Sequence, residues 1–257
     1  MRAAGLVVHD ALARVREAAR PGMTTAELDA LAEDCIRRAG AVPNFLGYGD
    51  PPFPATTCIS VNDEVVHGIP GERVLTTGDV VSVDCGAAVD GWHADAALTF
   101  ALGAVPPEVG RLLDATEEAM WRGVAAVRPG GRVGDVSAAV QAHLEAPSRR
   151  YGIVRDYTGH GIGSALHQPP DVPNSGRPGS GARIVEGMAL AVEPMVVLGD
   201  PDTETAEDEW TVVTADGSLA AHFEHTVAVT GSGAWVLTAP DGGRARLEAL
   251  GARYGGP

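Results

Sequence analysis

Two aspartates stand close together in a segment that otherwise has the pattern of an apolar β-hairpin. Asp79–Phe100 contains two β-rich runs on either side of Asp90-Gly91, a pair that tolerates the positive φ of a two-residue type I′ turn. A turn there places Gly86 opposite Asp95, so that Asp84 and Asp95 become diagonal neighbours on one face, with Cβ atoms roughly 7 Å apart. Two ionised carboxylates at that distance repel each other and lose hydration, so without a cation one of them must take up a proton.

The second half of the chain supplies further side chains that bind cations. His160 stands between two glycines, which let the backbone turn sharply and bring the imidazole forward. Glu193 and Glu224 each lie in an apolar run typical of a strand. A single aspartate in a strand is equally well explained by solvent exposure or by capping a turn. Four carboxylates in one core, however, balance the charge of two divalent cations.

This donor set predicts a reactive metal centre. Carboxylate oxygens with one imidazole favour Mn, Fe(II), Co or Zn, whereas a structural zinc site prefers Cys and His. Two such ions, roughly 3.5–4 Å apart, activate water for hydrolysis. The candidate ligands are Asp84, Asp95, His160, Glu193 and Glu224.

Composition narrows the class of protein. With 257 residues, of which 45% are hydrophobic and 21% charged, the chain fits one large globular domain or two small ones. A net charge of −15 disfavours a nucleic-acid-binding surface, and no apolar run reaches the roughly 20 residues that span a bilayer. Three cysteines without Cys-x-x-Cys spacing suit a reducing compartment, and the N-terminal segment lacks the apolar core of a signal peptide. We therefore expect a cytoplasmic protein without a membrane segment and without direct nucleic-acid binding.

The elements that must position the candidate ligands occur twice along the chain. An apolar stripe predicts a first helix that ends at Arg20-Pro21-Gly22, and a capping box of Thr24 and Glu27 begins a second helix. The same plan returns in a helix over 108–127.

This second copy ends at Arg128-Pro129-Gly130 and is followed by a helix that starts at Asp135. In each copy the strands that follow contain His-Gly-Ile, at His67 and at His160. Such repetition indicates two αβ halves, about 5–105 and 106–238, with a site between them. Residues 239–257 carry no comparable pattern, and we expect a poorly ordered tail.

Five motifs follow one another in a characteristic order. They are Val65-Val66-His67-Gly68-Ile69-Pro70, Asp84 with Asp95 eleven positions later, Gly159-His160-Gly161-Ile162-Gly163 with His167 after it, Gly187-Met188-Ala189-Leu190-Ala191-Val192-Glu193-Pro194-Met195, and Glu224-His225-Thr226. In this order they closely resemble methionine aminopeptidase of the bacterial type I class, from about residue 5 to residue 238. The resemblance implies the pita-bread fold, an α+β arrangement of two pseudo-symmetric halves around a central antiparallel sheet, as one catalytic domain over 1–257.

The resemblance also implies roles for the candidate ligands. Asp95 and Glu224 would bridge two divalent ions, Asp84 would complete the second ion, and His160 and Glu193 the first. Glu193 would in addition shuttle the proton of the attacking water. The ions would be Co, Mn, Fe or Zn.

Further residues match positions that contact the substrate in this family. His67 and His167 would contact the scissile peptide and stabilise its oxyanion. The side-chain pocket for methionine would be lined by Phe45, Tyr48, Cys58 and Trp210, an apolar and aromatic wall that suits a thioether. The loop over 49–52 is about two residues longer than the usual pocket loop. The remaining histidines are interpreted as structural or surface residues, namely His9, His93, His143, His222 and His225.

The function implied is removal of the initiator methionine from nascent polypeptides when the second residue is small. One alternative is an Xaa-Pro aminopeptidase or prolidase, which shares the five ligands but usually carries an extra N-terminal domain. The other is a non-catalytic pita-bread binding protein, which should have lost metal ligands. Nascent N-termini are the expected partners of a chain that we expect to act as a monomer, and a transient ribosome contact is left open.

Overall fold

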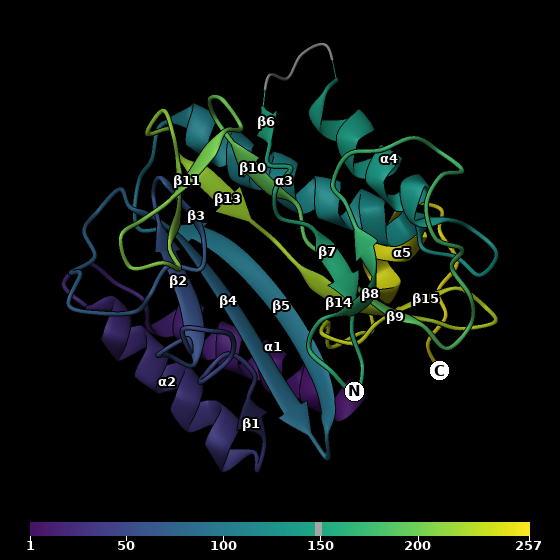
Figure 1. Cartoon of the computed structure of the whole chain (residues 1–257), viewed down its shortest axis with the longest axis horizontal. Coiled ribbons are helices and arrows are strands. Elements are labelled where there is room, and N and C mark those ends of the chain that lie inside the picture. The colour runs from purple at the N-terminus through teal and green to yellow at the C-terminus, as the bar shows by residue number, and fades with distance from the viewer. Residues whose placement is uncertain (147–150) are drawn as a thin grey trace.

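The four longer helices of the described residues form two pairs, one in each half of the chain. The computed structural model describes residues 1–146 and 151–257 (Figure 1). The helices are α1 (Arg2–Ala18), α2 (Thr25–Arg38), α3 (Pro107–Ala126), α4 (Val133–Leu144) and α5 (Arg244–Ala249). Helix α1 packs against α2 and α3 packs against α4, so the two predicted helix pairs are present.

Fifteen strands form the rest of the regular structure in the described residues. In the first half they are β1 (Val42–Pro43), β2 (Thr57–Val61), β3 (Glu64–Val66), β4 (Val80–Val89) and β5 (Trp92–Ala101). In the second half they are β6 (Gly152–Ile153), β7 (Gly159–Gly161), β8 (Gln168–Val172), β9 (Ala189–Val192), β10 (Met195–Val197), β11 (Thr203–Thr205), β12 (Val212–Thr214), β13 (Ala220–His222), β14 (His225–Val229) and β15 (Ala234–Val236). The pairings between these strands are antiparallel.

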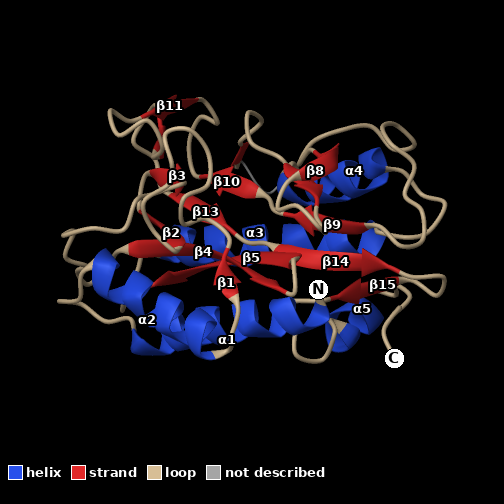
Figure 2. Ribbon diagram, turned by 60° about the horizontal axis from the view of Figure 1, so that its bottom comes forward, coloured by secondary structure: helices blue, strands red, loops and turns tan. Residues whose placement is uncertain are grey.

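The strands belong to four sheets. In the first half, β4 pairs with β1, β2 and β5. A five-stranded sheet of the second half has the order β15-β14-β9-β7-β8, and two three-stranded sheets have the orders β13-β10-β6 and β11-β12-β3. Helices α1 and α2 lie along one side of the long strands (Figure 2). Helix α1 contacts β4 and β5, while α3 contacts β10, β13 and β14.

The central hairpin has the predicted register. Val89 lies opposite Trp92 and Gly86 lies opposite Asp95. Asp90 and Gly91 have φ values of 51° and 77°, the positive values that a type I′ turn needs. Because side chains alternate along a strand, this register alone places the hairpin's two acidic ligand candidates on one face.

Capping residues fix where the second helix of each pair begins. The Thr24 hydroxyl accepts a hydrogen bond from the Glu27 amide at 3.1 Å, and the Glu27 carboxylate accepts one from the Thr24 amide at 2.8 Å. Such a box stabilises a helix start by about 1 kcal/mol. Helix α4 begins two residues before the predicted start, because Asp135 accepts from the Arg132 amide (3.0 Å) and so stands in its first turn.

The turns that join the helix pairs have matching hydrogen bonds. The Gly22 amide donates to the Leu75 carbonyl at 2.8 Å, and the Gly130 amide donates to the Ile184 carbonyl at 2.9 Å. In return the Leu75 amide donates to the Met23 carbonyl, and the Ile184 amide donates to the Gly131 carbonyl, both at 2.8 Å. Each helix pair is therefore tied in the same way to the strand region that follows it.

Residues 239–257 are packed, so the expectation of a poorly ordered tail is wrong. Leu247 of α5 is fully buried in the core of the second half. Arg246 forms an ion pair with Glu118 of α3 at 2.7 Å, and Tyr254 forms a β-bridge with Ala234 beside the end of the sheet. A six-residue helix with one buried side chain leaves too little periodicity for sequence reasoning to detect.

The helices of the described residues include none that is long and apolar enough to cross a bilayer.

Candidate metal centre and substrate cavity

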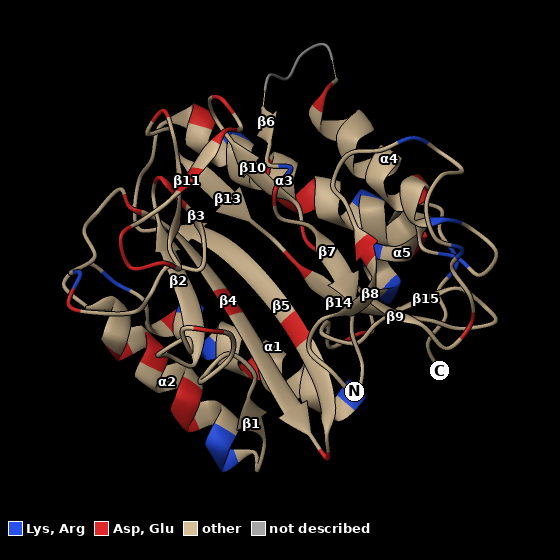
Figure 3. Cartoon of the chain, in the orientation of Figure 1, with Lys and Arg blue, Asp and Glu red and all other residues tan. Residues whose placement is uncertain are grey.

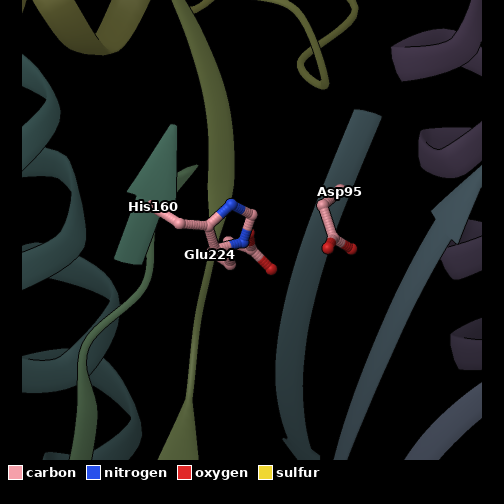
Figure 4. A group of neighbouring side chains, drawn as sticks. All are labelled: Asp95, His160 and Glu224. Atoms are coloured by element: carbon pink, nitrogen blue, oxygen red, sulfur yellow. The ribbon is translucent and has the colours of Figure 1, made fainter. Parts of the chain in front are cut away.

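Three of the candidate ligands converge in the core between the two halves. One ligand atom from each of Asp95, His160 and Glu224 lies within 4.8 Å of the other two, and these residues are 3%, 7% and 2% exposed. The side chains approach one another from β5, from β7 and from the residue before β14 (Figure 4). Acidic residues also stand out on β4 and β5, whose middle sections are otherwise uncharged (Figure 3).

Hydrogen bonds between the halves hold two of these ligands in place. The Asp95 amide donates to the Thr226 hydroxyl at 2.9 Å, and that hydroxyl donates to the Asp95 carbonyl at 2.7 Å. The Glu224 amide donates to the Ala97 carbonyl at 2.9 Å. Farther along β5, the Thr99 hydroxyl donates to the His222 carbonyl at 2.7 Å. We call this row of contacts between β5 and residues 222–226 the seam; it joins ligands that are far apart in sequence.

Close backbone packing explains the glycine before His160. A Cβ atom on Gly159 would lie 2.3 Å from the Ala191 carbonyl oxygen, so only glycine fits between β7 and β9 at that point. The His160 Nδ1 lies 2.9 Å from the Gly161 carbonyl, which can only accept. The Nδ1 atom therefore carries the proton, and Nε2 is left as a lone-pair donor.

The other two candidate ligands lie on the wall of the same cavity. Asp84 lies on β4, and Glu193 lies in the short link between β9 and β10. One carboxylate oxygen of Glu193 is 3.4 Å from the His160 Nε2. The Glu193 carbonyl accepts a hydrogen bond from the Asn174 amide group at 3.1 Å, which anchors the backbone there. The structure thus brings all five predicted ligands to one place.

The electrostatics of this group fit a divalent cation. Burial, reinforced by the neighbouring carboxylates, raises the pKa values of Asp84, Glu193 and Glu224 well above their usual range, and burial raises the pKa of Asp95 to about 7. Burial lowers the pKa of His160 to about 4, so its imidazole is neutral near pH 7. One buried oxygen each of Asp84, Asp95 and Glu224 finds no hydrogen-bond partner within the described part of the chain. A divalent ion satisfies such oxygens and offsets their mutual repulsion.

The five candidate ligands line a cavity of about 340 Å³, and we call the part of its surface that they form the floor. Its remaining lining is mostly apolar and aromatic, namely Phe45, Tyr48, Phe53, Cys58, Val66, His67, Tyr157, Thr158, His167, Asp171, Met195, Trp210 and His222. All four predicted pocket residues line this cavity. Phe45 and Cys58 are buried and Trp210 is half-buried, whereas Tyr48 is 41% exposed.

Two neutral histidines flank the floor. The His67 ring meets the rings of Tyr157 and Trp210 edge-on, with centroids 5.4 and 6.0 Å apart. The His167 ring meets that of His160 edge-on, with centroids 4.3 Å apart. Desolvation lowers the pKa of His67 to about 4 and also lowers the pKa of His167. Near pH 7 each imidazole can therefore donate one N–H to a substrate carbonyl or accept one hydrogen bond.

One histidine that lines this cavity was not among the predicted site residues. His222, interpreted as structural or surface, is 1% exposed and its Nε2 lies 3.7 Å from a carboxylate oxygen of Glu193. Burial lowers its pKa to about 3. The signal was present in the sequence, because His222 precedes Glu224 by two positions and residues at that spacing share one face of a strand.

Comparison with known proteins places this geometry in a family. Residues 1–231 match the model of metallopeptidase family M24. The chain is 51% identical over 239 residues to a methionine aminopeptidase of Clostridium acetobutylicum, covering 93% of this chain and 94% of the relative. It is 50% identical to methionine aminopeptidase 1 of Mycobacterium tuberculosis, covering 93% and 91%.

Solved structures agree with these sequence matches. The crystal structure of methionine aminopeptidase from Thermotoga maritima matches with a TM-score of 0.89 and 42% identity, over 93% of this chain and 94% of that one. The prolidase from Pyrococcus furiosus matches with a TM-score of 0.73 but 22% identity, over 93% of this chain and 62% of that one, which is a likeness in fold alone. The chain belongs to metallopeptidase family M24. The α+β pita-bread prediction is confirmed, and family membership implies that the enzyme uses divalent metal.

Proposed function

We propose that this enzyme removes the N-terminal methionine from nascent polypeptides when the second residue is small. One observation carries the proposal: four carboxylates and one imidazole line a cavity whose other walls include aromatic and sulfur-containing side chains. The names of the relatives that match over nearly their whole length support the same substrate.

For the metal centre we propose the arrangement that the family resemblance implies. Asp95 and Glu224 would help to hold both of two divalent ions, Asp84 would help to hold one of them, and His160 and Glu193 would help to hold the other. The oxygen-rich donor set suits Co, Mn, Fe or Zn. When bound, such ions supply Lewis acidity and activate water for attack on the scissile peptide bond.

The chain's own residues have separate tasks in this reaction. Glu193 is suited to take the proton of the attacking water and pass it to the leaving amine, because burial raises the pKa of its carboxyl group and so makes its ionised carboxylate a stronger proton acceptor. His67 and His167 are neutral and lie on the cavity wall, where an N–H donor can stabilise the developing oxyanion.

The apolar end of the cavity is suited to the methionine side chain. The Phe45 ring and the Cys58 thiol are nearly fully buried, with 8% and 4% exposure, and Trp210 packs edge-on against Phe53 with ring centroids 5.2 Å apart. An unbranched thioether gains favourable contacts with such rings, about 0.3–1.5 kcal/mol for each sulfur–aromatic pair.

We propose a monomeric, cytoplasmic enzyme in which both halves form one catalytic domain, with nascent N-termini as partners. Three free cysteines support a reducing compartment, and the seam that crosses the metal floor supports a single catalytic unit. A transient ribosome contact fits a substrate that emerges from synthesis.

The test is release of free methionine from Met-Ala-Ser by protein stripped of metal and then given Co(II), Mn(II), Fe(II) or Zn(II). Gly-Pro-Ala and Lys-Ala-Ser serve as comparison peptides. Metal-dependent cleavage of Met-Ala-Ser alone is the expected result. Faster cleavage of Gly-Pro-Ala would keep the metal chemistry but assign a prolidase-like substrate, and no cleavage with any metal would favour the non-catalytic binding protein.

A further inference from the structure

Tyr48 makes a contact that the role of pocket wall does not explain. Its side chain is 41% exposed, far more than the buried Phe45 and Cys58 with which it lines the cavity. Its hydroxyl oxygen lies 2.6 Å from the Nδ1 of His167, and the two rings meet edge-on with centroids 5.2 Å apart. The polar end of Tyr48 thus contacts a histidine, rather than the apolar end of the cavity.

Chemistry decides the direction of this hydrogen bond. A phenol is protonated near pH 7 and its O–H donates strongly to an imidazole nitrogen, whereas an imidazole N–H is a weak donor to a phenol oxygen. An imidazole is mostly neutral at pH 7.5, which is above its ordinary pKa of about 6.5. With Nδ1 accepting from Tyr48, the single ring proton of His167 must lie on Nε2.

The loop around Tyr48 holds its hydroxyl in this position. The Gly47 amide donates to the Phe53 carbonyl at 2.8 Å, and the Phe53 amide donates to the Tyr48 carbonyl at 2.7 Å, so the longer loop is closed by its own backbone. Gly49 has φ +81°, and a Cβ atom there would lie 2.6 Å from the Trp210 ring. The loop therefore packs closely against Trp210 at Gly49, next to Tyr48.

His167 also contacts His160. The two rings stand edge-on with centroids 4.3 Å apart, so the imidazole of His167 contacts both a proposed metal ligand and Tyr48. The His160 ring restricts where the imidazole sits but does not select which of its nitrogens carries the proton. Among the hydrogen bonds of the described residues, the one from Tyr48 is the contact that makes this selection.

We propose that Tyr48 is a positioning residue that fixes His167 in the Nε2–H tautomer and aims this donor at the scissile carbonyl. The consequence for catalysis rests on the proposed function, in which His167 stabilises the oxyanion. The tautomer itself is a property of the protein alone and is measured without substrate or metal.

The first test is nitrogen NMR of the full chain labelled with ¹⁵N-histidine, in metal-free buffer near pH 7.5, comparing wild type with Tyr48→Phe. His167→Gln identifies the signals of His167. Wild type is expected to show a bare Nδ1 and a protonated Nε2, and Tyr48→Phe a mixture of tautomers. Tyr151→Phe is the matched control, because it removes a phenol hydroxyl that donates at 3.1 Å to the Arg111 carbonyl. An Nδ1–H tautomer in wild type, or an unchanged tautomer in Tyr48→Phe, would overturn the proposal.

The second test is the kinetics of Tyr48→Phe on Met-Ala-Ser, because the variant keeps the ring and loses only the hydroxyl. We expect kcat to fall roughly tenfold, since a transition-state donor is then correctly placed only part of the time, with KM changed by less than about twofold. A rise in KM with kcat unchanged would mean that Tyr48 is only a wall of the pocket, and would overturn the proposal. If wild type releases no methionine, the proposed function fails, whereas the NMR result still decides the tautomer.

Discussion

The floor and the side wall of the cavity are built in different ways. The floor consists of side chains on or beside strands, of which Asp95, His160 and Glu224 are buried and Asp84 and Glu193 are half-buried, and the seam ties its backbone across the two halves. The wall over 45–53 is a loop that carries an exposed tyrosine and closes on itself by backbone hydrogen bonds. Paired strands thus hold the candidate metal ligands, while a loop determines the shape of the space beside them.

Asp95→Asn should produce the largest effect, because it changes the centre of the floor. An amide is a poor substitute for a carboxylate that is proposed to hold both metal ions, so turnover of Met-Ala-Ser should fall by roughly 1000-fold or more. The metal-free variant should melt no lower than wild type, because a buried, repelling carboxylate has been removed. Peptide hydrolysis and thermal melting measure the two effects. Turnover near that of wild type would contradict the proposed metal centre.

Thr226→Val tests whether the seam supports the floor. The change keeps the shape of the side chain but leaves the Asp95 amide and carbonyl without their partner. The free energy of unfolding should fall by about 1–3 kcal/mol. Metal affinity, measured by calorimetry, should fall with it because Asp95 is less well oriented. Ser232→Ala is the control, because it removes a hydroxyl that bonds to Thr230 in the exposed turn between β14 and β15 and does not take part in the seam. Unchanged metal affinity would show that the hydrogen bonds of the seam do not support metal binding by the floor.

Phe45→Ala tests the wall without touching the floor. Loss of a buried ring from the proposed methionine pocket should raise KM for Met-Ala-Ser by roughly tenfold through lost apolar contact. Metal affinity should stay as in wild type, because Phe45 is not one of the proposed ligands. A parallel loss of metal binding would show that the wall and the floor are not independent.

The smallest expected effect is the pH dependence of the metal-free protein. Histidines whose folded pKa is lowered add stability as pH rises, but that gain is complete above about pH 6.5, the pKa of an unfolded histidine. Carboxyl groups whose folded pKa is raised, such as Asp95 at about 7, act oppositely, and their stabilisation is lost as pH rises through the folded value. Between about pH 6.5 and 8.5 the metal-free Tm should therefore drop by a few degrees. Added Mn(II) should remove this dependence, and a metal-free Tm that rises with pH would contradict the burial of these carboxyl groups.

The sequence predicts the floor of the cavity better than it predicts the wall. The pairing of Asp84 with Asp95 was predictable because strand alternation and a type I′ turn at Asp90-Gly91 fix which side chains share a face. Residue type and motif indicate His160, Glu193 and Glu224 as further candidates, but their approach to the hairpin depends on contacts between the two halves. The wall was predictable only as a set of rings, because the direction of a side chain on an irregular loop depends on contacts such as that of Tyr48 with His167. The packing of residues 239–257 could not be predicted, because it comes from tertiary contacts rather than from a local sequence pattern.

The seam has a consequence for how the protein acquires activity as it is made. Asp95 and Thr226 are separated by 131 positions, so their contact closes a long loop and should form late in folding. The hairpin of the first half can pair as soon as it is synthesised, but it brings only two of the five proposed ligands. A newly made chain should therefore have no hydrolytic activity until the strands that follow Glu193 and Glu224 have docked, and neither half should be active by itself.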